Sequence, residues 1–448
     1  MLKITAYGAA KEVGRSCILI EDKDTKVILD CGLKINHETP TSAPEGIEEH
    51  MEDLSGVIVS HAHLDHVGYV PGLFARNYQG EVHMTAPTKE LATILWHDHL
   101  KIEGDRHFNA EHIKLTQDHI VTHTYEDKFK VSDGVTATFY DAGHIIGSAG
   151  ILLEWNGTNI FYTGDQMSMP TIWHDPARLP NEEVDVIISE ATNALRPAPQ
   201  RTEVIEGLTR MILRAIARKR KVLIPSFSLG RGQELQVAMM EGFEDLVRTY
   251  VDGMILEMNK IYKRYFTPEW VSPQILQWSA ERSLLTPFDH EMLTPIRKRN
   301  GASKETFRRE LMKNNSPSII ITTSGMLEGG PIHSYLRYRG DDPNTLLTLV
   351  GYQVENTIGH SILNGKRELT LSSPRGDETE LQLKAQVEAF NFTSHASPEG
   401  LRALVTQLDP NMVLIVHCQP EAGEAFRKSL GTERKGFLLT RQEPKVVN

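Results

Sequence analysis

The segment VIVSHAHLDHVG constrains this chain more than any other. His61, His63, Asp65 and His66 crowd a turn that directly follows an apolar strand. If strand geometry continues, His61 and His63 point to the same side, and the turn can direct Asp65 and His66 toward a second ion. Such packing of an uncommon residue has no folding advantage, so the turn predicts two neighbouring metal sites rather than an ordinary surface segment.

Two later motifs add ligands of the same kind. DAGHIIGSAG contains His144 and FYTGD contains Asp165, each at the end of an expected strand. Alone, such a histidine is more often a core residue and such an aspartate a turn former. Their order after the histidine turn favours metal binding. The three cysteines are scattered without CxxC spacing, so histidines and carboxylates must supply the ligands.

The rhythm of strands and helices predicts two lobes, as expected for a chain of 448 residues. Short β-rich runs with turns dominate the first part. Near Glu190 repeated strand-to-helix units begin, which indicates a mainly parallel sheet. We therefore predict a first domain in two parts, with an inserted domain between them: 1–195, 196–366 and 367–448.

Composition excludes some classes of protein. The formal net charge of −11 argues against gripping nucleic acid by bulk positive charge, although it leaves room for a local basic channel. The N-terminal segment lacks the pattern of a signal peptide, and no apolar run approaches the ~18 residues of a membrane span. A cytoplasmic protein without membrane contact is expected.

The motifs together resemble a known family. The HxHxDH turn, AGHxxGS and YTGD look like the metallo-β-lactamase superfamily. SEAT, PSFSLGRGQE, VDGM, TTSGMLEGGP, GYQVENTIG, SHAS and VHC resemble its β-CASP subgroup of nucleic-acid-processing nucleases. The chain looks most like archaeal homologues of the cleavage-and-polyadenylation endonuclease subunit, with RNase J as the close alternative. The resemblance implies an α/β protein, a metallo-β-lactamase αββα sandwich with an inserted α/β β-CASP cap.

The resemblance also implies two zinc ions. One would be held by His61, His63 and His144, the other by Asp65, His66 and His417, with Asp165 bridging them. Neutral imidazoles and carboxylates suit zinc, and manganese stays an alternative because ligand type does not settle metal identity.

Three further residues match catalytic positions of the family. Asp30, in VILDCG, would orient the site by accepting a hydrogen bond from a metal ligand or from the metal-bound water. Asp65 is counted both as a metal ligand and as a catalytic residue. Glu190 would orient His395, which would contact the scissile phosphate or protonate the leaving oxygen. Alone, Glu190 and His395 would more often be structural.

Candidate substrate contacts are Ser324, Gly325 and Arg231 in glycine-containing loops, and Ser397 after His395. Two positions depart from the family pattern: Cys418 replaces a usual glycine, and Ser397 is more like RNase J. A further histidine tract comprises His97, His99, His107, His112, His119 and His123, for which surface or packing roles are favoured over a third metal site.

The expected activity is hydrolysis of single-stranded RNA, internal and followed in some cases by 5′-to-3′ trimming. A DNA-processing β-CASP nuclease, a small-molecule metallohydrolase and a catalytically dead RNA-binding scaffold are the rivals. The small-molecule enzyme would not need so large a cap, and the scaffold would be expected to have lost metal ligands. A homodimer is left open.

Overall fold

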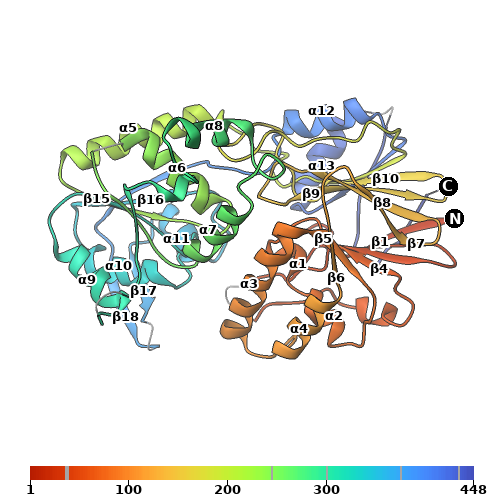
Figure 1. Cartoon of the computed structure of the whole chain (residues 1–448), viewed down its shortest axis with the longest axis horizontal. Helices are drawn as coiled ribbons and strands as arrows, with labels where there is room; N and C mark the ends of the chain where they lie inside the picture. The colour runs from red at the N-terminus through yellow and green to blue at the C-terminus, as the bar shows by residue number, and fades with distance from the viewer. Residues whose placement is uncertain (36–39, 244–245, 299–300, 374–375, 432–433, 448) are drawn as a thin grey trace. The chain divides into compact units, whose positions relative to one another are not determined.

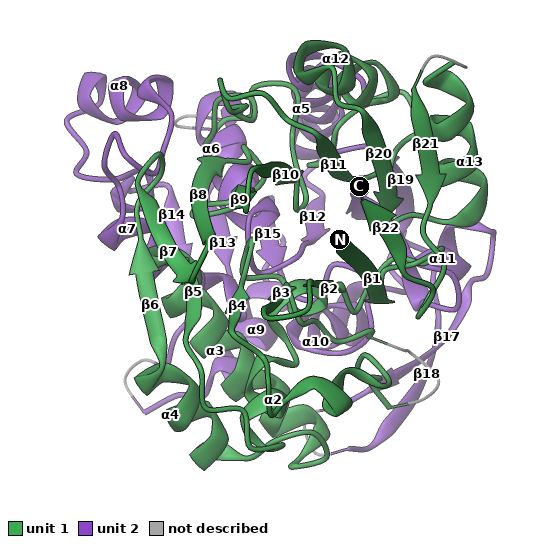
Figure 2. Cartoon of the chain, turned by 90° about the vertical axis from the view of Figure 1, so that its right-hand side faces the viewer, with its two compact units in different colours: residues 1–198, 394–448 green, residues 199–393 purple. Residues whose placement is uncertain are grey.

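The computed structural model describes residues 1–35, 40–243, 246–298, 301–373, 376–431 and 434–447. The chain divides into two compact units, Met1–Ala198 with Ser394–Asn448, and Pro199–Thr393 (Figure 2). Within the described ranges, every helix is too short or too polar to span a bilayer.

The strands of the first unit form two mixed sheets (Figure 1). Among the described residues each sheet has seven strands. The first sheet has the order β22 (Lys445–Val447), β1 (Leu2–Gly8), β2 (Cys17–Glu21), β3 (Lys26–Leu29), β4 (Gly56–Ile58), β5 (Val82–Thr85) and β6 (Ile120–His123). The second has the order β21 (Lys435–Leu438), β20 (Met412–Val416), β11 (Val186–Glu190), β10 (Thr158–Tyr162), β9 (Ala149–Trp155), β8 (Val135–Asp141) and β7 (Lys128–Ser132).

Helices complete the layers of this unit. Their bounds are α1 (Leu64–Val67), α2 (Val70–Phe74), α3 (Ala86–Glu103), α4 (Ala110–Asp118), α12 (Pro398–Leu408) and α13 (Pro420–Ser429), with a 3₁₀ turn at Ile47–His50. Between the sheets, apolar residues of both, such as Ile20 and Ile151, form one buried cluster. On the other face of the second sheet, Ile187 packs with Leu404 of α12 and Phe426 of α13. The αββα sandwich predicted from the sequence is therefore confirmed.

The second unit is built on a parallel sheet of six strands. Their order is β14 (Leu293–Pro295), β13 (Thr249–Val251), β15 (Ser318–Thr322), β12 (Lys221–Pro225), β16 (Thr345–Val350) and β19 (Gln386–Phe390); β17 (Glu368–Ser372) and β18 (Glu378–Gln382) form a separate hairpin. The helices are α5 (Arg201–Ala217), α6 (Arg231–Phe243), α7 (Ile255–Arg264), α8 (Pro273–Glu281), α9 (Lys304–Lys313), α10 (Pro331–Arg339) and α11 (Ile358–Leu363), and a 3₁₀ turn spans Pro287–Asp289. The mainly parallel sheet predicted for this part is confirmed.

The second unit ends later than the inserted domain predicted from the sequence. The prediction was 196–366, whereas the compact unit extends to Thr393. The reason is that β19 continues the sheet by pairing in parallel with β16, from Leu346↔Gln386 to Val350↔Phe390. Leu371 of β17 also joins the core of this unit. The sequence predicts a strand at β17, leaves the β19 segment unassigned, and does not say which sheet either of them joins.

Candidate metal centre

Strand ends of the first unit carry the side chains of the candidate metal centre. The histidine turn follows β4, His144 follows β8, Asp165 follows β10 and His417 follows β20. The parallel pairs Tyr162↔Ile188 and Glu190↔Val416 align the carboxyl ends of β10, β11 and β20. Strands of both sheets therefore bring together residues that are distant in the sequence.

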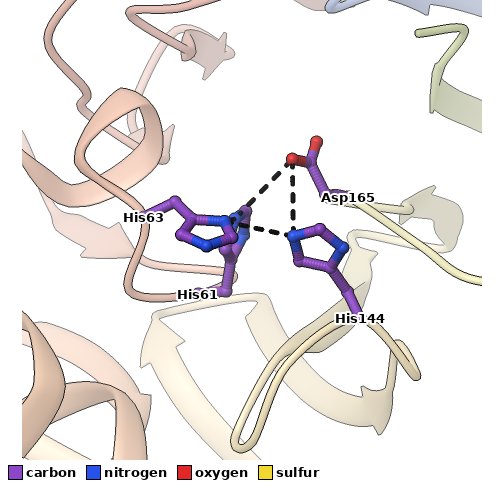
Figure 3. Close-up of side chains that lie close together, drawn as sticks. All are labelled: His61, His63, His144 and Asp165. Carbon is purple, nitrogen blue, oxygen red and sulfur yellow. Dashed lines mark hydrogen bonds and ion pairs between the residues drawn. The ribbon is translucent and has the colours of Figure 1, made fainter. Parts of the chain in front are cut away.

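Four of these side chains form a first group, shown in Figure 3: His61, His63, His144 and Asp165. Nε2 of His61 and Nε2 of His144 each lie 3.1 Å from Nδ1 of His63. Oδ2 of Asp165 lies 3.7 Å from Nε2 of His61 and 3.9 Å from Nε2 of His144. Ligands bound at about 2.0–2.1 Å around a tetrahedral zinc ion stand roughly 3.3 Å apart, so this spacing fits one such ion.

Protonation in this group also suits a metal. Burial lowers the pKa of His61, His63 and His144, which favours the neutral imidazoles that bind metals. Burial alone would raise the pKa of Asp165, but His417 and His66 hold it well below its usual value. Neutral imidazoles beside an ionised carboxylate form a donor set typical of zinc.

A second group consists of Asp65, His66 and His417. Nε2 of His417 lies 3.2 Å from Oδ2 of Asp65. Nε2 of His66 and Nδ1 of His417 each lie 3.3 Å from Oδ1 of Asp165. The two groups therefore meet at Asp165, whose carboxylate presents one oxygen to each.

The Oδ1 atom of Asp165 shows most clearly that a cation would fit this site. It is buried and makes no hydrogen bond among the described residues. A buried anionic oxygen without such a partner costs free energy that a bound cation would offset. The residues present therefore fit a dinuclear metal site with a shared carboxylate.

Asp30 lies behind this centre and is fully buried. Its Oδ2 accepts hydrogen bonds of 2.7 Å from Nδ1 of His66, Oγ of Ser60 and the hydroxyl of Tyr162. Its Oδ1 accepts another of 2.7 Å from the backbone N–H of Ser60. Because Asp30 holds Nδ1 of His66, Nε2 of that ring is directed to Asp165. This position suits the orienting role predicted for Asp30.

Glu190 and His395 form a close pair beside the first group. Nδ1 of His395 lies 3.1 Å and 3.0 Å from the two carboxylate oxygens of Glu190. Backbone N–H groups of Gln166 and Thr192 donate to the same carboxylate and fix it. Burial lowers the pKa of His395, but Glu190 and Asp165 outweigh it and raise the pKa to about 9. This direction favours the protonated form of His395, which is the form that a general acid needs.

The predicted substrate contacts fall in both units. In the first unit, Ser397 caps α12, and its Oγ accepts a hydrogen bond of 3.1 Å from the backbone N–H of Gly400. In the second unit, Ser324 and Gly325 follow β15, and Ser324 Oγ accepts from the N–H of Glu328. Arg231 begins α6 and is buried, with its guanidinium 5.0 Å from the centre of the Phe392 ring.

Sequence reasoning missed several groups that support the ligands. Tyr162 donates to Asp30, Thr192 Oγ donates to the carbonyl of His417, and Nδ1 of His144 donates to the carbonyl of Ser394. That last bond fixes Nε2 as the nitrogen available to a metal. Tyr162 and Thr192 stand within the motifs FYTGD and SEAT, which was the signal that could have found them.

The extra histidine tract has packing roles where the structure describes it. His112 completes the capping box of α4, and the ring of His123 stacks on Phe129 at 3.6 Å. His107 contacts Thr41. These residues take no part in the metal-capable groups found among the described residues.

Three protein families match parts of the chain. The Beta-Casp domain matches residues 233–362 and the Zn-dependent metallo-hydrolase RNA specificity domain matches residues 380–438. The family of the Anti-Pycsar protein Apyc1 matches residues 5–201. A solved structure, described as a protein of unknown function from Enterococcus faecalis V583, covers 100% of both chains with a TM-score of 0.62 at 13% identity. That likeness supports the fold alone.

Curated relatives match nearly the whole chain. The transcription termination factor FttA of Methanocaldococcus jannaschii is 33% identical over 434 residues, covering 93% of this chain and 67% of the relative. FttA of Thermococcus kodakarensis is 32% identical, covering 98% and 70%. Integrator complex subunit 11 of Danio rerio is 29% identical, covering 96% and 71%. Together with the layered fold and the histidine–aspartate centre, these matches show that the chain belongs to the β-CASP family of metallo-β-lactamase-fold hydrolases, the family of FttA.

Proposed function

We propose that this chain is a metal-dependent ribonuclease that hydrolyses phosphodiester bonds within single-stranded RNA. The observation that carries the proposal is the carboxylate of Asp165, whose two oxygens face two separate groups of metal-capable side chains. The match to an RNA specificity domain supports RNA as the substrate. The chain spans about two thirds of the FttA relative from Methanocaldococcus jannaschii, so the role in that relative's name supports RNA processing only as part of this proposal.

Two zinc ions are the proposed cofactors, with manganese as the alternative. His61, His63 and His144 would hold one ion, and Asp65, His66 and His417 the other, with Asp165 shared. When bound, such a pair activates water at neutral pH and neutralises charge on the phosphate. The chain's own contribution is to fix each ligand atom, as Asp30 does by holding Nδ1 of His66.

The pair of Glu190 and His395 supplies the proton for the leaving oxygen. Glu190 holds Nδ1 of His395, so the proposed chemistry uses the Nε2–H of that ring. The charge of Glu190 also keeps His395 protonated before the reaction. A proton donated to the leaving oxygen as the P–O bond breaks would contribute roughly 10²–10⁴-fold in rate.

Internal cleavage is the proposed mode, with 5′-to-3′ trimming as a secondary activity. Trimming from an end needs a pocket that recognises a 5′ phosphate. Ser397 is the candidate for one contact in such a pocket, where its hydroxyl would exchange its hydrogen bond to Glu399 for one to the phosphate. One hydroxyl is too little to form a pocket that recognises a 5′ phosphate. Internal cleavage is therefore favoured.

A circular single-stranded RNA tests this function, because it offers no end. We expect zinc-loaded protein to open the circle, and the His97→Ala variant, which changes an exposed histidine outside the centre, to do so equally well. An intact circle beside degraded 5′-phosphorylated linear RNA would contradict internal cleavage. Failure to cut either RNA would contradict the ribonuclease proposal, and preferred cutting of single-stranded DNA would replace it with a DNA nuclease.

A further inference from the structure

Two exposed aromatic rings follow neighbouring strands of the sheet in the second unit. Phe227 is 37% exposed and Tyr352 is 49% exposed, and among the described Phe, Tyr and Trp side chains they are the ones that reach such exposure. Phe227 is the second residue after β12 and Tyr352 the second after β16, and these strands pair in parallel through Lys221↔Thr345. Both rings therefore lie at the carboxyl edge of the sheet, where α/β proteins bind ligands.

Gly325, which follows β15, contacts both ring-bearing segments. A side chain on Gly325 would come within 2.9 Å of the backbone nitrogen of Phe227 and 3.5 Å of its ring. On the other side, Nε2 of Gln353, the residue after Tyr352, donates to the carbonyl of Gly325 at 3.2 Å. One glycine thus touches Phe227 directly and the Tyr352 segment through Gln353. We call Phe227 and Tyr352 the aromatic edge.

The backbone that carries each ring is anchored. The N–H of Ser226 donates to the carbonyl of Thr322, and the hydroxyl of Ser226 donates to the carbonyl of Phe227. The N–H of Gly351 donates to the carbonyl of Phe390, and Gln353 is 3% exposed. Exposed rings on a fixed backbone lose little conformational entropy when a ligand binds to them.

The space and charge at this edge suit bases. Around Gly351, next to Tyr352, the position that a Cβ atom would occupy has no atom within 4 Å. The backbone at Gly351 therefore borders open space. Acidic Glu328 and Glu355 follow β15 and β16 at the same edge, opposing the positive charge of Arg231. The acidic side chains do not attract phosphate, so an aromatic edge here would hold a strand by stacking on its bases.

We propose that the aromatic edge stacks on bases of single-stranded RNA and holds the strand without reading its sequence. Every base has a flat face, so aromatic stacking tolerates different sequences. This inference rests on the proposed function, because it names a binding site for that substrate. It adds Phe227 and Tyr352 to the substrate contacts as base-stacking residues rather than phosphate ligands.

The test measures binding of a fluorescent single-stranded RNA to the full chain in EDTA, so that the strand is not cut. We expect Phe227→Ala and Tyr352→Ala each to weaken binding roughly 5- to 100-fold, the range for loss of one stacked base. Phe227→Trp and Tyr352→Phe, which keep a ring, should bind within about twofold of the unchanged chain. Leu285→Ala, which removes a side chain that is 87% exposed in the same unit, is the matched control and should change nothing.

An RNA containing abasic residues separates stacking from other contacts. The unchanged chain should lose affinity for this strand, whereas the double alanine variant should bind intact and abasic strands alike. Variants that weaken binding to both strands equally would overturn the proposal. If the alanine variants still cut RNA and bind it with unchanged affinity, the aromatic edge is not an RNA site, but the proposed function stands. If the same variants lose self-association instead, the aromatic edge is a protein contact. A chain that neither binds nor cuts RNA would overturn the proposed function as well.

Discussion

The metal centre of the first unit and the aromatic edge of the second both lie at the carboxyl ends of parallel strands, yet they present opposite kinds of groups. The metal centre gathers buried polar side chains, such as Asp30 and His61, that hydrogen bonds hold in place. The aromatic edge presents exposed rings beside glycine backbone. Buried, fixed donors suit bond breaking, which needs exact positions, whereas exposed rings suit holding a variable strand. Substitutions in the two regions should therefore fail in different ways.

The largest effect is expected at the carboxylate shared by the two metal groups. Asp165→Ala should lose both metals and nearly all activity while keeping the fold, because its oxygens face both groups. Metal analysis beside circular dichroism checks this. Two equivalents of metal retained per chain would contradict the shared role.

His395→Ala should keep normal metal content and cut RNA at least about 100-fold more slowly, as expected when a general acid is removed. Its Nδ1 lies 3.0 Å from Glu190 and 4.0 Å from Asp165, and these three side chains form a third metal-capable group, so metal content must be measured beside the rate. Metal content and single-turnover rate are measured together. Loss of metal would make His395 a ligand, and an unchanged rate would remove it from the mechanism.

Asp30→Asn should lower metal affinity about 10- to 100-fold, the usual cost of losing a group that orients a ligand. The amide cannot accept all the hydrogen bonds that Asp30 accepts, among them the one from His66. A competitive metal titration measures the change, with Asp24→Asn on the surface as control. Equal metal affinity in both variants would show that Asp30 does not orient the centre.

The pH profile should sharpen the role of Glu190. In the proposed mechanism protonated His395 is the active form, so the rate should fall as pH rises through its pKa of about 9. Burial has the largest effect on this pKa and lowers it. The charge of Glu190 has the second largest effect and raises it. Glu190→Gln should therefore move the fall in rate to lower pH. A fall at the same pH in both proteins would assign it to another group.

The smallest effect is expected at Gly325. In Gly325→Ala the added methyl would meet backbone atoms of Ser226 and Phe227 at 3.0 Å and 2.9 Å, so the Phe227 segment must shift. RNA affinity should fall severalfold, with metal content and the intrinsic cleavage step unchanged. Lower metal content in this variant would show that the aromatic edge and the metal centre do not act separately.

The metal-capable residues could be predicted from their chemistry, whereas backbone conformations, strand pairing and side-chain exposure depend on tertiary packing. Few residue types bind zinc, so His61 and Asp165 could be recognised in their motifs. The left-handed backbone of Asp30 and His417, with φ of 57° and 49°, could not be predicted, because surrounding hydrogen bonds impose it. Nor could the pairing of β19 with β16, since alternation predicts a strand and not its partner. The exposure of Phe227 likewise depends on packing that no local pattern encodes.

The central claim is that two metal ions share Asp165. Anomalous diffraction from crystals of the zinc-loaded chain tests it most directly. We predict two peaks about 3.5–4 Å apart, one beside His61, His63 and His144, the other beside Asp65, His66 and His417, with one oxygen of Asp165 bound to each or bridging both. A single peak, or two peaks of which only one contacts Asp165, would contradict the account.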